Sequence, residues 1–257
     1  MLTRRSLVIA RNGAKLLLSD PAPIVMMVIM PVILIAFLLP SYKAQLQAQG
    51  FAAANGTEQL VPGMAVMFAF MSTMLVATLF YREHAWGTWE RLRASSASSL
   101  DLVLGKIAPL ALCLYLQTIT VFAAGRLFFG YDPNGSTAGI LLVAAALVAT
   151  IAGFGLLLVS VFSTMDQTLV VGNLGGMLMS GIGGALAPTS TLPAWMQAVS
   201  HAMPTYWVMS AFRDLTLAHA TLGAVEGRIA ILLAFALGFL AIALTQFKPS
   251  DAKIGTT

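Results

Sequence analysis

Six long apolar runs, none of which contains a charged side chain, constrain the fold of this chain more than any other feature. An α-helix of about 20 apolar residues crosses the hydrocarbon core of a bilayer, and only helices or closed barrels satisfy their backbone hydrogen bonds there. Hydrophobic residues make up 58% of the sequence and charged residues 9%, against about 45–50% and about 25% in soluble domains. The sequence therefore predicts an all-α integral membrane protein with six transmembrane helices at residues 24–39, 61–81, 107–125, 138–162, 169–186 and 229–247.

The positions of Lys and Arg predict how these helices are oriented. With both termini in the cytoplasm, the inner segments hold ten Lys and Arg residues and the outer segments hold four. Because positive side chains concentrate on the cytoplasmic side, this distribution favours cytoplasmic termini. At the outer end of the last span we expect Glu226 and Arg228 to pair with each other or with Arg213 and Asp214. No basic patch interleaved with aromatic residues is present, so we do not expect nucleic acid as a partner.

Residues 1–20 have the pattern of an amphipathic helix. Arg4, Arg5, Arg11 and Lys15 fall on one helical face, and Leu, Ile and Ala side chains fall on the other. Such a basic helix lies in the headgroup plane of membrane lipid. Two interpretations stay open: the helix only sets the topology, or it also packs against a cytoplasmic partner.

The loop between the second and third spans, residues 82–106, carries the most specific chemistry of the chain. Glu83 and Glu90 are spaced to share one side of a helix, with Arg91 and Arg93 nearby. Ser98 precedes Asp101 by three residues, a spacing that caps the start of a further helix. We therefore expect a helix, a turn and a helix at the membrane edge.

This loop resembles the cytoplasmic loop of ABC-2 type exporter permeases. The residues that carry the resemblance are Glu83, Gly87, Thr88, Glu90, Leu92, Ala94, Ser95, Ser98, Leu104, Gly105 and Lys106. Many family members have Pro where this chain has Ser96. A second segment, residues 187–222, is similar to the extracytoplasmic re-entrant helices of the same family through Pro188, Pro193, Trp195, Pro204 and Tyr206.

The resemblance implies a layout and a role for each part of the chain. Residues 1–20 would be the interfacial helix, 21–247 the six-helix transmembrane domain with short re-entrant helices between spans five and six, and 248–257 a cytoplasmic tail. The loop would contain the coupling helix that docks on an ATPase subunit. Its coupling residues would be Glu83, Trp86, Gly87, Thr88, Glu90, Arg91 and Arg93, and those of the outer gate Pro188, Pro193, Trp195, Pro204 and Tyr206. The alternative for the loop is a solvated segment whose charges only maintain topology.

The chain is not expected to be an enzyme. It has no G-x-x-x-x-G-K-[ST] phosphate loop, so ATP and Mg would be bound by a separate ABC ATPase present in two copies. A second permease, identical to this one, would complete an ATP-hydrolysing translocase in a bacterial inner membrane. No metal site is expected, since the single cysteine, Cys113, lies in a span and no H-E-x-x-H motif occurs.

The spans also contain polar and flexible side chains that could line a translocation path. The candidates are Met67, Met71, Gln117, Asn173 and Ser180; packing between helices is the alternative for each. Glycines between residues 172 and 184 predict close helix approach. Abundant Met favours a hydrophobic or amphipathic cargo such as a drug, antibiotic, lipid or glycolipid. The alternatives are a polysaccharide or lipid-linked glycan exporter of the same family and, from another class, a non-transporting membrane scaffold or immunity protein.

Overall fold

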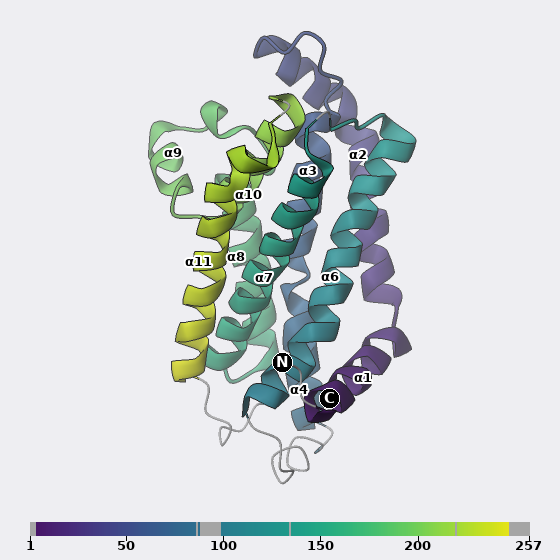
Figure 1. Ribbon diagram of the computed structural model, residues 1–257, viewed down its shortest axis with the longest axis vertical. Coiled ribbons are helices and arrows are strands. Elements are labelled where there is room, and N and C mark those ends of the chain that lie inside the picture. Colours follow the sequence, from purple (N-terminus) through teal and green to yellow (C-terminus); the bar gives the residue numbers. More distant parts are fainter. Residues whose placement is uncertain (1–3, 86, 88–98, 134, 219, 247–257) are drawn as a thin grey trace.

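A computed structural model of the chain describes residues 4–85, 87, 99–133, 135–218 and 220–246. These residues form an elongated helical bundle, and no strand occurs among them (Figure 1). The helices are α1 (Arg4–Ser19), α2 (Ala22–Ala48), α3 (Thr57–Met71), α4 (Thr73–Ala85), α6 (Ser99–Phe129), α7 (Thr137–Val161), α8 (Met165–Ile182), η1 (Thr189–Thr191), α9 (Ala194–Ser200), α10 (Pro204–Leu217) and α11 (Leu222–Gln246). The all-α prediction is confirmed for the described part of the chain.

Within the described residues, five segments are long and apolar enough to cross a membrane. They are Ala22–Ala48, Thr57–Arg82, Gly105–Phe129, Thr137–Val161 and Leu222–Gln246. Each overlaps one of the predicted runs along most or all of that run's length. Helix α8 overlaps the remaining run, 169–186, but its first turns carry Asp166, Gln167 and Asn173, so its mean hydropathy is lower. The structure thus gives five membrane-spanning candidates, and the sixth span stays a prediction.

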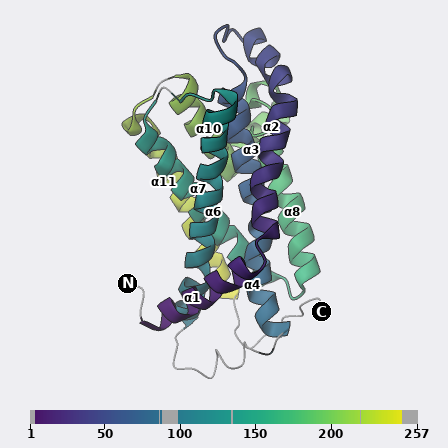
Figure 2. The same ribbon diagram turned by 90° about the vertical axis from the view of Figure 1, so that its right-hand side faces the viewer.

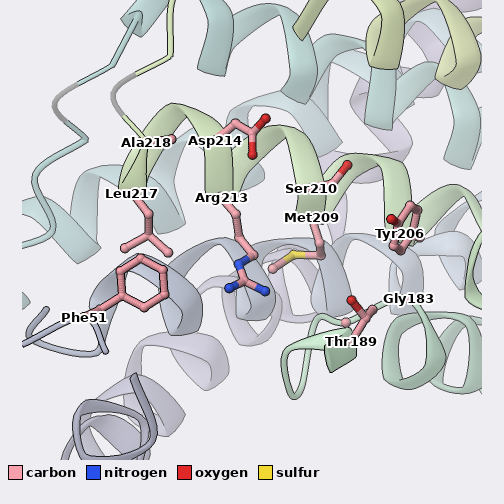
Figure 3. Close-up of a pocket in the computed structure, with 11 residues that line it drawn as sticks. Phe51, Gly183, Thr189, Tyr206, Met209, Ser210, Arg213, Asp214, Leu217 and Ala218 are labelled. Atoms are coloured by element: carbon pink, nitrogen blue, oxygen red, sulfur yellow. The ribbon is translucent and has the colours of Figure 1, made fainter. Parts of the chain in front are cut away.

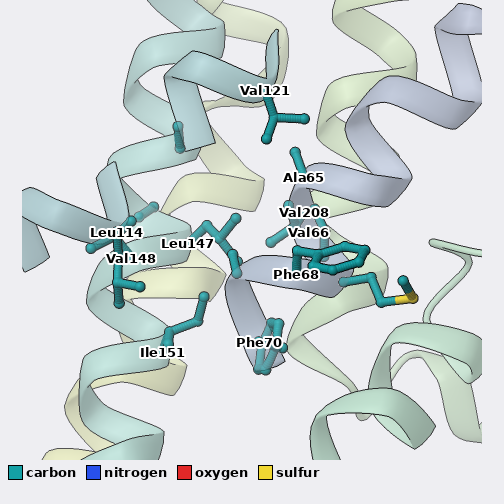
Figure 4. Close-up of a cluster of buried hydrophobic side chains, with 14 of the residues drawn as sticks. Ala65, Val66, Phe68, Phe70, Leu114, Val121, Leu147, Val148, Ile151 and Val208 are labelled. Carbon is teal, nitrogen blue, oxygen red and sulfur yellow. The ribbon is translucent and has the colours of Figure 1, made fainter. Parts of the chain in front are cut away.

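The centre of the bundle is formed by α3 and α4. In the most apolar stretch of Thr57–Arg82, 89% of the residues are buried within the protein, against 11% for Ala22–Ala48 and 11% for Leu222–Gln246. Side chains of α3 such as Val66 and Phe70 pack with Leu147 and Ile151 of α7 and with Leu114 of α6 (Figure 4). Thr57–Arg82 and Ala22–Ala48 are thus both strongly apolar, but the first lies inside the bundle and the second lies at its edge.

Helix α1 lies across the foot of the bundle, at a steep angle to α2 (Figure 2). It packs on the start of α6, where Ser6 and Ile9 are buried, while Arg11 and Lys15 are exposed. The segment predicted to be amphipathic is thus a helix with one face packed on α6 and the other face exposed. At the opposite end of the bundle, η1 and α9 form a short excursion, and α10 returns toward α3 and α11.

Candidate functional site

Two regions at opposite ends of the bundle carry the residues of functional interest. We call them the inner and the outer region after the orientation predicted from the sequence, and the inner region is the loop between α4 and α6. Trp86, Thr88, Glu90, Arg91 and Arg93 lie outside the described residues. Glu83 lies within α4. Gly87 is exposed and has a φ of +65°, a left-handed conformation that glycine adopts readily after the end of a helix.

Helix α1 contacts both ends of this loop. At the first end, Arg82 Nη2 lies 3.8 Å from Asp20 Oδ2, just beyond the end of α1. At the other end, a Cβ atom placed on Gly105 would lie only 2.7 Å from Ile9 Cβ and 2.9 Å from the Ser6 carbonyl oxygen. Gly105 therefore lets α1 approach α6 more closely than any other residue would permit. A displacement of the loop would act on α1 as well as on α4 and α6.

Lys106 adds a contact between the two helices that flank the loop. Its side chain is buried, and its ammonium group donates a hydrogen bond to the Leu79 carbonyl oxygen at 3.3 Å and lies 4.6 Å from the centroid of the Phe80 ring. The cation-π contact and the hydrogen bond together tie the start of α6 to α4. The sequence places Lys106 in the loop motif, but nothing in the pattern indicates that its side chain is buried.

The residues proposed to line a path lie on α3, α6 and α8. Gln117 is buried; its amide nitrogen donates to the Met27 carbonyl oxygen at 3.3 Å, and its amide oxygen accepts from the Ser72 hydroxyl at 2.9 Å. These hydrogen bonds join α6 to α2 and to the break between α3 and α4, which is a packing role. Ser180 is fully buried, and its hydroxyl has no hydrogen-bond partner among the described residues. Path lining by Met67, Met71, Gln117, Asn173 and Ser180 stays a prediction.

The glycines of α8 produce the close approach that the sequence predicts. A Cβ on Gly176 would lie 3.3 Å from Phe70 Cβ of α3, and one on Gly172 would lie 3.2 Å from Leu158 Cδ1 of α7. The opposite side of α8 exposes Leu174, Met177 and Leu178. The small residues therefore face the bundle and the large apolar ones face outward.

The outer region begins where α8 ends. Gly184 has a φ of +92°, and its carbonyl oxygen accepts a hydrogen bond of 2.8 Å from the buried Gln59 amide of α3. The Thr205 hydroxyl of α10 donates to the Met179 carbonyl, and the Tyr42 hydroxyl of α2 donates to the Leu186 carbonyl. Three other helices thus hold this turn in place.

The predicted outer-gate residues lie on the segment that follows this turn. Pro188 and Pro193 directly precede η1 and α9, and Pro204 is the first residue of α10, positions where proline's fixed φ favours a helix start. Trp195 is 61% exposed. The Tyr206 ring packs against His201 with centroids 4.3 Å apart. Of the five, Tyr206 alone lines the cavity described next.

A cavity of about 310 Å³ lies between this turn and α10. Arg213 and Asp214 both contribute to its lining, and their side chains point in different directions (Figure 3). Asp214 Oδ2 lies 2.7 Å from Arg228 Nη2 of α11. Burial lowers the pKa of the Arg213 guanidinium below its ordinary value, and the neighbouring Asp214 charge opposes that shift. Of the pairings expected from the sequence, the structure forms the one between Arg228 and Asp214. The Arg213 guanidinium faces the cavity.

Comparison with known proteins places the chain among membrane transport proteins. The model of the family described as "ABC-2 type transporter" matches residues 4–217. The chain is 25% identical over 185 residues to "Linearmycin resistance permease protein LnrN" of Bacillus subtilis (strain 168), a match that covers 72% of this chain and 48% of the relative. It is 27% identical over 161 residues to "Probable multidrug ABC transporter permease YbhR" of Escherichia coli (strain K12), covering 61% of this chain and 42% of the relative.

A third relative, "Probable multidrug ABC transporter permease YbhS" of Escherichia coli (strain K12), is 21% identical over 194 residues, which cover 74% of this chain and 51% of the relative. The matched part of the chain thus spans about half the length of these curated relatives. No solved structure matches the chain.

Proposed function

Because this chain belongs to the ABC-2 type transporter family, we propose that it is the membrane-spanning permease subunit of an ATP-binding cassette exporter. Members of this family are membrane subunits of transporters rather than enzymes, and the long apolar helices make this chain an integral membrane protein. The exporter would move a hydrophobic or amphipathic cargo out of the cytoplasm or the inner leaflet. A separate ATPase subunit would bind ATP and Mg and supply the energy.

The observation that carries the proposal is the contact of α1 with both ends of the loop 82–106. An ATPase that moves this loop must transmit the motion to the spans through packed elements. The Asp20–Arg82 pair, the Gly105–Ile9 contact and the buried Lys106 connect the loop with α1, α4 and α6. A loop that only maintained topology would need none of these contacts.

The complete permease would have a sixth span formed by α8. Its 18 residues at a rise of about 1.5 Å give about 27 Å, close to the hydrocarbon thickness of about 30 Å. Leu174, Met177 and Leu178 would then face lipid or a second permease. We place both termini in the cytoplasm and the chain in a bacterial inner membrane, with two permeases and two ATPases forming the working unit.

The relatives narrow the class of cargo that we propose. Their names refer to linearmycin resistance and to probable multidrug transport, and they support export of a drug or antibiotic. Lipid and glycolipid belong to the same amphipathic class. ATPase activity of the reconstituted complex, measured with drugs, lipids and glycolipids in turn, would identify the compounds that stimulate it.

The coupling role is tested by charge reversal in the loop. We expect Glu83→Arg or Glu90→Arg to abolish cargo export by proteoliposomes containing the permease and its ATPase, while ATP hydrolysis continues, because these carboxylates would pair across a polar interface with the ATPase. Glu226→Arg is the matched control, since Glu226 is exposed on α11 at the opposite end. Unchanged export in both loop variants would show that the loop does not couple the two subunits.

A further inference from the structure

Arg213 is a half-buried cation whose neighbouring carboxylate, Asp214, forms its ion pair with another arginine. Among the described residues it forms no hydrogen bond or ion pair, although it is adjacent to Asp214 in the sequence. Consecutive residues of a helix point about 100° apart, and Asp214 is directed to Arg228, whose Nη2 lies 2.7 Å from it. Arg228 also donates to the Ala224 carbonyl oxygen at 3.2 Å. The Asp214 carboxylate, although Asp214 contributes to the cavity lining, is therefore paired with Arg228 rather than with Arg213.

Two further carboxylates in the vicinity, Glu58 and Asp132, are also engaged, and Asp132 pairs with Arg126 at 3.7 Å. Glu58 lines a neighbouring cavity that shares Phe51 and Leu217 with the first. Its two carboxylate oxygens accept hydrogen bonds from the Asn55 and Gly56 amides at 3.2 and 2.9 Å. It thus serves the start of α3. Arg213 and Arg228 therefore have one neighbouring carboxylate, Asp214, between them, and a net positive charge remains beside the cavity.

The walls of the cavity combine apolar surface with hydroxyl groups. Phe51 and Leu217 lie on one side of the guanidinium, and Met209 lies beside it (Figure 3). Thr189 and Tyr206 contribute hydroxyls that have no hydrogen-bond partner among the described residues. An anion in the cavity would receive the planar fork of an arginine together with hydroxyl donors.

The size and rigidity of the cavity restrict what can enter it. A volume of about 310 Å³ is at the lower limit of ligand pockets, which measure about 300–1,000 Å³, so it fits a head group rather than a whole drug-sized molecule. Gln59 and Thr205 hold the turn that forms its floor. Because this turn is already fixed by hydrogen bonds, a ligand that binds above it loses little affinity to ordering of the turn.

We propose that this cavity binds the anionic end group, a phosphate or a carboxylate, of an amphipathic molecule whose chain lies on the apolar wall. Arg213 is the anion-binding residue, Thr189 and Tyr206 are additional donors, and Phe51 and Leu217 contact the start of the chain. As a statement about the cargo, this rests on the proposed export function. The same chemistry is offered by exported amphiphiles and by anionic phospholipids of the membrane.

The test is a binding measurement on the full chain in phosphatidylcholine nanodiscs. We expect dodecyl phosphate to bind at least about tenfold more tightly than dodecyl maltoside, because one charge-assisted interaction corresponds to about that factor. Arg213→Gln should remove this preference. Arg126→Gln is the matched control: Arg126 carries the same charge at the same end of the bundle, is 67% exposed and pairs with Asp132 at 3.7 Å, and its loss should change nothing.

A second variant keeps Arg213 and gives it a carboxylate partner within the cavity. Thr189→Glu places a carboxylate across the cavity from Arg213, and it should weaken dodecyl phosphate binding as strongly as Arg213→Gln does. Equal affinity for dodecyl phosphate in the wild type and in both variants, or equal affinity of the wild type for the phosphate and the maltoside, would overturn the proposal.

Two further measurements distinguish whether the bound anion is a membrane phospholipid or an exported amphiphile. If phosphatidylglycerol in the nanodisc lowers the apparent affinity for dodecyl phosphate, the site takes a membrane lipid. If it does not, and dodecyl phosphate stimulates the ATPase activity of the assembled transporter in an Arg213-dependent way, the site takes cargo. The binding measurement contains no ATPase, so the failure of the loop variants to uncouple export would leave its result standing.

Discussion

At the scale of single residues, glycines decide how closely the helices of this bundle approach one another. A Cβ atom on Gly63 of α3 would lie 2.1 Å from the Ala185 carbonyl oxygen, and one on Gly125 of α6 would lie 2.7 Å from Val61 Cγ1. Such separations are shorter than van der Waals contact, so no larger residue fits without movement of the backbone. The sequence pattern drew attention to the glycines of residues 172–184, but Gly63 stands alone in its run, and nothing in the pattern distinguishes it.

Gly63→Ala should lower the free energy of unfolding by about 1–3 kcal/mol, since the added methyl group collides with backbone rather than with a flexible side chain. The measurement is thermal unfolding of the purified permease in detergent. Gly238→Ala in α11 is the control, because a Cβ there meets nothing within 4 Å and alanine favours a helix by about 1 kcal/mol. Equal unfolding temperatures for the two variants would contradict the close contact at Gly63.

At the scale of elements, α1 is the helix whose role depends most on tertiary contacts. Its amphipathic pattern predicts a helix on the membrane surface, and the structure adds that it packs on α6 and pairs with the end of α4. The Asp20–Arg82 pair is 49% and 38% exposed, so it contributes little to stability. Packing on α6, which includes the close approach of Ile9 to Gly105, is therefore the stronger of these two contacts of α1.

Gly105→Leu should detach α1 from α6, because the leucine side chain would occupy the space of Ile9 and the Ser6 carbonyl. Cleavage by trypsin after Arg11 and Lys15, followed by mass spectrometry, reports the fraction of molecules in which α1 is detached from α6. A loss of about 1.4 kcal/mol in docking would raise the cleavage rate about tenfold. In Gly13→Ala the new Cβ would lie 3.2 Å from Pro109 Cγ, a milder contact, and the rate should stay close to that of the wild type. Equal rates in all three proteins would rule out the packing of α1 through Gly105.

At the scale of the whole molecule, the bundle has two ends with different chemistry. One carries α1 and the start of α6, to which Lys106 belongs; the other carries α9 and α10, to which Arg213 belongs. The ten-to-four distribution of positive residues assigns the first end to the cytoplasm. This assignment is a prediction about orientation in the membrane, and the single native cysteine makes it simple to test.

In a Cys113→Ala background, we expect Ala52→Cys to react with a membrane-impermeant maleimide on intact spheroplasts and Asn12→Cys to react only after lysis. Both positions are exposed, Ala52 near the outer cavity and Asn12 on α1. The measurement is the fraction of each variant labelled before and after lysis. Labelling of Asn12→Cys in intact spheroplasts would invert the topology proposed here.

The apolar runs alone identify this chain as a helical membrane protein, because runs of about 20 apolar residues have no other stable arrangement in a bilayer. The sequence also carried the loop and outer-segment patterns of ABC-2 type permeases, since those patterns are local. It did not distinguish the central span, Thr57–Arg82, from the peripheral Ala22–Ala48, because both are uniformly apolar and burial depends on neighbours contributed by other helices.

Only the tertiary structure decided which charge at the outer end is available to a ligand. Arg213 and Arg228 are both close enough in the sequence to Asp214 for either to be its partner. The position of α11 beside α10 gives the carboxylate to Arg228 and turns Arg213 into the cavity. The physical reason is that an ion pair forms through space over a few ångströms, and the packing of whole helices sets that separation.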